Sequence, residues 1–263
     1  MLLDMTTSAL SEHDRHVHVE RVMGTVVSID IRCRAAAQDA IERAVALLHE
    51  ADATFSTYRD DSAIRRLDRH ELSIGDAAAE VRQVLRSCEA LRRETGGAFD
   101  ARCRGSLDPS AYVKGWAAQR AADLLVAEGF GDVCVTAGGD VAARGHASPG
   151  APWRVGIQHP RDRTAIAAVV DATDLAVATS GAYERGEHVV DPSTGLAPRG
   201  VLSVTVTGPD LGRADAYSTA GFALGPAAAE WTTRLPPGYE ALTITADDRV
   251  LSTRDFPFAQ GDR

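Results

Sequence analysis

Apolar residues along the chain follow two spacings, one typical of strands and one typical of helices. Residues 20–31 are rich in β-branched side chains and predict a strand, and apolar positions then recur at helical spacing over residues 41–48. Longer apolar stripes predict helices over residues 76–94 and 113–128, and a glycine follows each of them. The first half of the chain is therefore expected to be a strand followed by helices.

Short strands become more frequent in the second half. Strands are predicted over residues 133–135, 153–157, 166–170, 202–206, 241–245 and 250–252, and helices over residues 214–224 and 227–234. These elements do not alternate strictly as strand, helix and strand, which argues against a Rossmann fold. We expect an α+β protein with a mixed β-sheet and packed helices, in a single domain over residues 19–263 that follows a disordered leader at residues 1–18.

Composition supports one domain and narrows the possible functions. With 263 residues and 44% apolar positions, the chain can bury one sizeable core. Its formal net charge of -9 argues against nucleic acid or anionic lipid as a partner. No segment approaches the roughly 18 consecutive apolar residues of a membrane span, and no basic start precedes a long apolar run. We therefore expect a cytoplasmic protein without a membrane segment, in which an anionic ligand would need a local cation.

The segment ADAYSTAGFALG is a candidate metal site. Asp215 and Thr219 are four residues apart, so on a helix their oxygen atoms lie on one face. A hard cation such as magnesium prefers oxygen ligands. The alternative is that Asp215 caps the helix while Ser218 and Thr219 bond to backbone carbonyls, and the spacing taken alone favours that alternative.

The segment DPSAYVKGWA is a candidate phosphate site. Asp108, Lys114 and Gly115 precede a predicted helix whose first N-H groups could meet an anion, and the lysine could bind phosphate as a point charge. The alternative is a solvated lysine beside a glycine turn. The segment has neither the Walker nor the Rossmann glycine spacing, which argues against a nucleoside triphosphatase.

The segment ATSGAYERGEHVVDPSTG places His188 beside a predicted strand. Histidine titrates near neutral pH, so it could accept a hydroxyl proton. A structural histidine is the alternative, and no GxSxG motif accompanies it, so this segment does not indicate a hydrolase.

Taken together and in order, these segments resemble the ApbE family of FAD:protein FMN transferases over residues 23–225. The resemblance also rests on VMGTVVSI, FSTYRDDSAIRRLD, TGGAFD, DPSAYVKGWAAQRAADLL and VTAGGDVAARG. It implies an ApbE-like, T-fold-related architecture. The chain departs from the family pattern in the few residues between Asp100 and Asp108, where family members usually carry a long insertion. It also has Gln119 where the family often has aspartate, and Ala111 where it has glycine.

The resemblance implies a magnesium-dependent enzyme that transfers FMN from FAD to a Ser/Thr hydroxyl of an acceptor flavoprotein and releases AMP. It implies that Mg²⁺ is held by Asp215, Ser218, Thr219 and the carbonyl of Ala111. It places FAD against Met23, Tyr58, Ala98, Phe99, Asp100, Asp108, Lys114, His188 and Val189. His188 is the candidate base, and Asp215 shares the catalytic role through the metal.

Two other functions use the same pocket. A hydrolase would split FAD into FMN and AMP with water as the acceptor, and a non-catalytic protein would only bind or deliver the flavin. The hydrolase would release free FMN without a protein acceptor, whereas the binding protein would tolerate the loss of Asp215.

Overall fold

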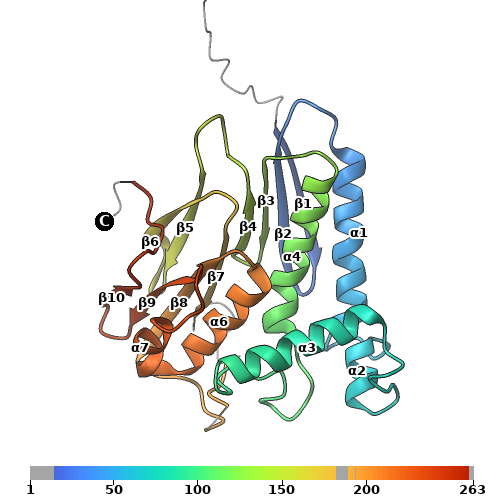
Figure 1. The fold of residues 1–263 in the computed structure, drawn as a ribbon, viewed down its shortest axis with the longest axis vertical. Coiled ribbons are helices and arrows are strands. Elements are labelled where there is room, and N and C mark those ends of the chain that lie inside the picture. Colours follow the sequence, from blue (N-terminus) through green and yellow to red (C-terminus); the bar gives the residue numbers. More distant parts are fainter. Residues whose placement is uncertain (1–14, 182–188, 193, 261–263) are drawn as a thin grey trace, which may run out of the picture.

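The computed structural model describes residues 15–181, 189–192 and 194–260, and Figure 1 shows their arrangement. The strands are β1 (Arg15–Val22), β2 (Thr25–Arg32), β3 (Val133–Ala137), β4 (Asp140–Arg144), β5 (Trp153–His159), β6 (Asp162–Ala172), β7 (Ala176–Gly181), β8 (Val201–Gly208), β9 (Glu240–Thr245) and β10 (Val250–Ser252). The α-helices are α1 (Gln38–Phe55), α2 (Ala63–Asp68), α3 (Ala79–Glu94), α4 (Ser110–Ala127), α6 (Leu211–Ala223) and α7 (Ala228–Thr232).

The described strands form one large sheet and one small one. The large sheet has the order β1-β2-β3-β4-β7-β8-β9-β10, and β5 pairs with β6. Helices α1, α4 and α6 lie side by side over one face of the large sheet (Figure 1). Trp153 and Ile157 of the β5–β6 hairpin pack against Val141 and Val177 on the other face. The α+β class is confirmed, although all described pairings are antiparallel and the expected mixed sheet is in fact antiparallel.

The start of the sheet differs from the sequence prediction. Instead of a single strand over residues 20–31, β1 and β2 form a hairpin that turns at Met23 and Gly24, with φ angles of 54° and 64°. A methionine with positive φ is uncommon, so the sequence gives little sign of this turn. Because β1 begins at Arg15, the last four residues of the expected leader at residues 1–18 belong to the sheet. Residues 1–14 lie outside the described residues.

Three elements were not predicted: α2, β4 and β7. Helix α2 has only six residues, too few to show a helical period, and it begins where the side chain of Ser62 accepts a hydrogen bond from the backbone of Arg65. Strands β4 and β7 lie in the middle of the sheet, and their small side chains are almost all buried. A strand buried on both faces does not alternate between apolar and polar residues, which removes the usual signal.

Helices α4 and α6 touch through their backbones. A Cβ atom on Gly115 would lie 2.5 Å from the carbonyl oxygen of Leu211, and one on Gly212 would lie 2.9 Å from the ring of Tyr112. The two helices therefore approach more closely than side chains would allow. Within the described residues, none of the helices combines the length and the apolar character needed to cross a membrane.

Gly115→Ala is expected to destabilise the protein by about 2 kcal/mol, because the new methyl group meets backbone that cannot rotate away, and this outweighs the gain in helix propensity. Urea unfolding measures the change. Gly131→Ala is the matched control, since a Cβ there meets nothing within 4 Å. Equal unfolding midpoints for Gly115→Ala and the unmodified protein would contradict the tight contact.

Candidate active site

The β1–β2 turn and the β3–β4 turn both carry sequence motifs, and they meet at one end of the strands of the large sheet. The β3–β4 turn contains Gly138 and Gly139, with φ angles of 58° and 100°. The backbone N-H of Gly138 donates to the carbonyl of Val26 at 3.0 Å, and a Cβ on Gly138 would lie 2.7 Å from the hydroxyl of Thr25. The structure therefore packs the GGD turn directly against the turn of the MGT segment.

Asp140 follows the two glycines and is the first residue of β4. Its side chain is fully buried, and its Oδ1 accepts a hydrogen bond of 3.0 Å from the backbone N-H of Thr179 on β7. Asp140 also pairs with Ala137 across the β3–β4 ladder. Backbone pairing and a side-chain hydrogen bond thus fix this carboxylate, which sequence reasoning noted only as part of a glycine turn.

Lys114 reaches this carboxylate from α4. Its Nζ lies 2.5 Å from Oδ2 of Asp140 and 3.8 Å from Oδ2 of Asp215. The helix begins at Ser110, so the expectation that Lys114 and Gly115 precede the helix is wrong, and Lys114 belongs to its second turn. The solvated lysine of the alternative interpretation is also wrong, because the side chain is 18% exposed and ion-paired.

Asp215 lies in α6 and is almost fully buried, with 3% of its surface exposed. It does not cap this helix: Asp210 is the N-cap, and its carboxylate accepts a 2.7 Å hydrogen bond from the backbone of Arg213. The capping alternative is therefore contradicted. Asp215 instead faces Lys114, which brings two of the sequence-predicted site residues together.

Three hydroxyl groups lie next to this ion cluster. Ser180 at the end of β7 is within hydrogen-bonding distance of Ser218, at 2.9 Å, and of Thr219, at 3.2 Å. Ser218 donates to the carbonyl of Asp215 at 2.9 Å, as the alternative interpretation expected for that residue. Ser180 was not among the residues predicted for the site, although it lies in the segment ATSGAYERGEHVVDPSTG.

The oxygen atoms of this cluster suit a hard cation. Two buried carboxylates and three hydroxyls gather where α4, α6, β4 and β7 meet. Ala111 lies in α4, three residues before Lys114. The described residues contain no group of three His, Cys, Asp or Glu side chains that could hold a metal by themselves. Mg²⁺ usually keeps several waters and binds one or two carboxylates together with substrate phosphates, so this sparse set fits it.

Gln119 serves a structural purpose. Its side-chain oxygen accepts a 2.6 Å hydrogen bond from the backbone N-H of Leu211, the first residue of α6. This contact ties α4 to the start of α6. The residue that departs from the family pattern therefore holds the two site helices together.

The loop between α3 and α4 carries four of the residues predicted to contact FAD. Ala98 and Phe99 are buried, with 9% and 3% exposure, and the ring of Phe99 belongs to the main core. Asp100 and Asp108 stand at the two ends of the short loop, which is closed by a 2.7 Å hydrogen bond from the backbone N-H of Asp108 to the carbonyl of Ala101. The structure thus brings these four residues into one compact turn.

A recess of about 290 Å³ adjoins this loop, between it and α3. Asp100 and Arg102 line it from the loop, and Cys88 and Arg92 line it from α3. Burial raises the pKa of the Cys88 thiol to about 12, so the thiol stays protonated near neutral pH and is not a nucleophile.

The remaining predicted residues are more dispersed. Met23 forms the turn of the β1–β2 hairpin, Tyr58 follows α1 and is 93% exposed, and Val189 is buried in the main core. His188 lies outside the described residues.

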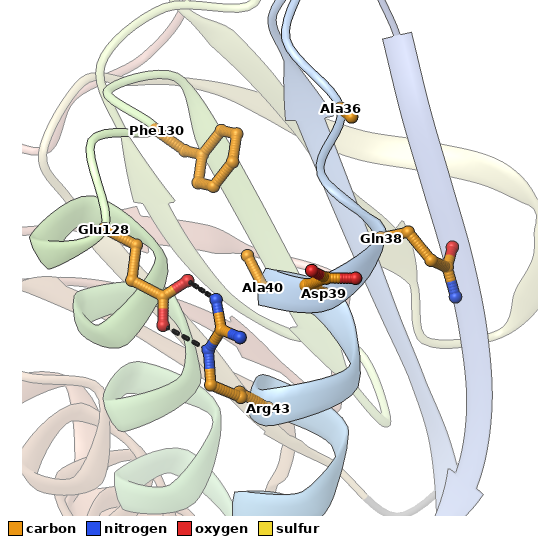
Figure 2. A pocket seen from close by; sticks show the side chains of 7 residues that line it. All are labelled: Ala36, Gln38, Asp39, Ala40, Arg43, Glu128 and Phe130. Carbon is orange, nitrogen blue, oxygen red and sulfur yellow. Dashed lines mark hydrogen bonds and ion pairs between the residues drawn. The ribbon is translucent and has the colours of Figure 1, made fainter.

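A larger recess, of about 520 Å³, lies between the start of α1 and the end of α4 (Figure 2). Arg43 and Glu128 form a two-pronged ion pair in it, at 2.6 and 2.7 Å. Glu128 is fourteen residues beyond Lys114, and at 1.5 Å per helical residue this places the two about 20 Å apart. This recess is therefore separate from the ion cluster.

Comparison with known proteins identifies the family of this chain. The family model described as ApbE family matches residues 23–106 and 101–243. The two matched parts meet at residues 101–106, within the short loop between Asp100 and Asp108. The chain belongs to the ApbE family, as the resemblance of its motifs implied.

Known relatives and solved structures support the same assignment. A FAD:protein FMN transferase of Klebsiella pneumoniae is 38% identical over 138 residues, which make up 49% of this chain and 39% of that protein. The ApbE protein of Thermotoga maritima has the same fold, with a TM-score of 0.83 and 23% identity, over 91% of this chain and 97% of its own. The flavin transferase ApbE of Vibrio cholerae gives a TM-score of 0.82 and 24% identity, over 93% and 99%. The chain matches only about two fifths of the length of the curated relative.

Proposed function

We propose that this protein transfers FMN from FAD to a Ser/Thr hydroxyl of an acceptor flavoprotein. The observation that carries the proposal is the buried cluster of Lys114, Asp140 and Asp215, with hydroxyl groups beside it, at the place where the family motifs converge. The names of the curated relatives support the same activity.

The reaction requires charge neutralisation around a pyrophosphate. The acceptor oxygen forms a bond to the FMN-side phosphorus, the bond from that phosphorus to the bridging oxygen breaks, and AMP leaves with that oxygen. Lys114 offers a positive charge to the phosphate oxygens, and His188 accepts the hydroxyl proton. When bound, Mg²⁺ would supply several kcal/mol of transition-state charge stabilisation, and Asp215, Ser218, Thr219 and the Ala111 carbonyl would hold it.

The flavin would lie along the motif turns. The turn of Ala98, Phe99 and Asp100, with Met23, Tyr58, Asp108 and Val189, would surround FAD. The exposed ring of Tyr58 offers an aromatic face that a flat isoalloxazine ring can stack against. Asp100 and Asp108 border the short loop, and their carboxylates can accept hydrogen bonds from ribityl or ribose hydroxyls.

The acceptor is an electron-transfer flavoprotein with a Ser/Thr-containing motif, as the family resemblance implies. The cytoplasmic location expected from the sequence stays a prediction. FAD hydrolysis and non-catalytic flavin binding are the competing functions, and both would occupy the same site.

Intact mass spectrometry separates the three functions. The protein is incubated with FAD, Mg²⁺ and an acceptor domain, and transfer is expected to raise the acceptor mass by one FMN group with one AMP released per event. An acceptor variant with its hydroxyl residue replaced by alanine serves as the control. Free FMN and AMP with an unmodified acceptor would indicate the hydrolase, and unchanged FAD would indicate a binding protein.

A further inference from the structure

Two buried carboxylates compete for one lysine at this site. The ammonium of Lys114 lies 2.5 Å from Asp140 but 3.8 Å from Asp215, and the side chains of both aspartates are at most 4% exposed. Since Coulomb attraction falls with distance, Asp140 holds the lysine and Asp215 interacts with it more weakly. The three side chains together contribute a formal charge of -1.

We propose that Asp140 is a positioning residue that holds Lys114 away from Asp215 and so keeps the Asp215 carboxylate available to a divalent cation. This inference rests on the proposed function, because it takes Asp215 to be the magnesium ligand. It adds a residue that acts on the metal through the lysine and not by direct contact.

The carboxylate of Asp140 is held in one orientation. Its Oδ1 is occupied by the backbone N-H of Thr179, which leaves Oδ2 directed at Lys114. Its backbone is fixed by the pairing with Ala137 and by the glycine turn before it. The flexible partner is the lysine, which has a four-carbon stem with rotatable bonds.

Without the Asp140 charge, Lys114 would move closer to Asp215, the second carboxylate that it contacts among the described residues. The ammonium already lies 3.8 Å from the Asp215 carboxylate, and the attraction to Asp140 would no longer oppose a closer approach. Shortening that contact would place a positive charge on the oxygen atoms that a metal needs. The lysine would also repel Mg²⁺ more strongly once Asp140 no longer neutralises it, so both effects weaken metal binding.

Calorimetric titration with Mg²⁺ alone tests the proposal. Asp140→Asn is expected to weaken Mg²⁺ binding about tenfold to a hundredfold, the range typical of residues that support metal ligands. The asparagine keeps an acceptor for the Thr179 N-H, and thermal unfolding checks that the variant is folded. The double variant Asp140→Asn with Lys114→Met is expected to recover affinity to within about threefold of the unmodified protein, because the competing charge is gone.

The matched control is Asp132→Asn, which removes the same charge near β3. The carboxylate of Asp132 accepts a backbone hydrogen bond from His146 at 2.8 Å, outside the site, so Mg²⁺ affinity is expected to stay unchanged. If Asp140→Asn does not fold, the single variant Lys114→Met tests the proposal. It is expected to bind Mg²⁺ at least as tightly as the unmodified protein. Weaker binding would overturn the proposal.

Three other results of the Mg²⁺ titration would each contradict the proposal in a different way. Weak binding by Asp140→Asn that the lysine substitution does not restore would make Asp140 a direct ligand and overturn the positioning role. Unchanged or tighter binding by Asp140→Asn would also overturn it. If the unmodified protein bound Mg²⁺ neither alone nor with FAD present, the magnesium site of the proposed function would fail, and the inference with it.

Discussion

Asp215→Asn is expected to abolish FMN transfer while leaving the protein folded. The substitution removes one negative charge from a hard-cation site and changes the volume of the side chain very little. Losing several kcal/mol of transition-state stabilisation corresponds to a rate loss of more than about a hundredfold. Single-turnover transfer at several Mg²⁺ concentrations measures the effect, and thermal unfolding reports on the fold.

Asp210→Asn is the control for this prediction. Asp210 belongs to the same helix and loses the same charge, but it caps the helix start through the backbone of Arg213, a role that asparagine also performs. Transfer by Asp210→Asn is expected to match that of the unmodified protein. Full activity of Asp215→Asn at low Mg²⁺ would contradict the metal role of Asp215.

His188→Ala is expected to slow transfer about a hundredfold to ten-thousandfold, with FAD binding nearly unchanged. This range is typical of a general base, and the substitution removes the group proposed to accept the hydroxyl proton. Single-turnover rates measure the chemical step, and FAD titration measures binding. A rate loss below about tenfold would leave His188 a positioning residue.

The pH profile provides a second and independent test of His188. A histidine base accepts a proton only in its neutral form, so transfer should slow at acidic pH, where the ring is protonated. His188→Ala should lack this acidic limb while retaining a slow residual rate. An acidic limb of the same shape in both proteins would assign the titration to another group.

Local sequence patterns predicted the helical parts of the site well. Asp215, Ser218 and Thr219 were placed on one helix, and the structure puts the serine and threonine hydroxyls beside Ser180. The start of α4 was predicted too late, because Ser110 and Ala111 add nothing to the apolar stripe from which its limits were drawn. Lys114 falls inside the helix predicted over residues 113–128 but before the helix in the phosphate-site interpretation, and the structure agrees with the first of these.

The contribution of Asp140 and Ser180 could not be predicted from local patterns. Asp140 meets Thr179 only because β4 pairs with β7, and the two residues are separated by 39 positions in the chain. Non-local pairing of this kind leaves no period in the sequence. The glycines before Asp140 were the available signal, and they indicated a turn without indicating what lies across from it.

The glycine contact between α4 and α6 limits which substitutions the site can accept. Lys114 adjoins Gly115, and Asp215 lies one turn beyond Leu211 and Gly212, so the separation of lysine and carboxylate depends on two backbones in direct contact. A redesign that is meant to keep the distance between Lys114 and Asp215 therefore has to retain these two glycines, together with the Gln119 contact that ties the same helices.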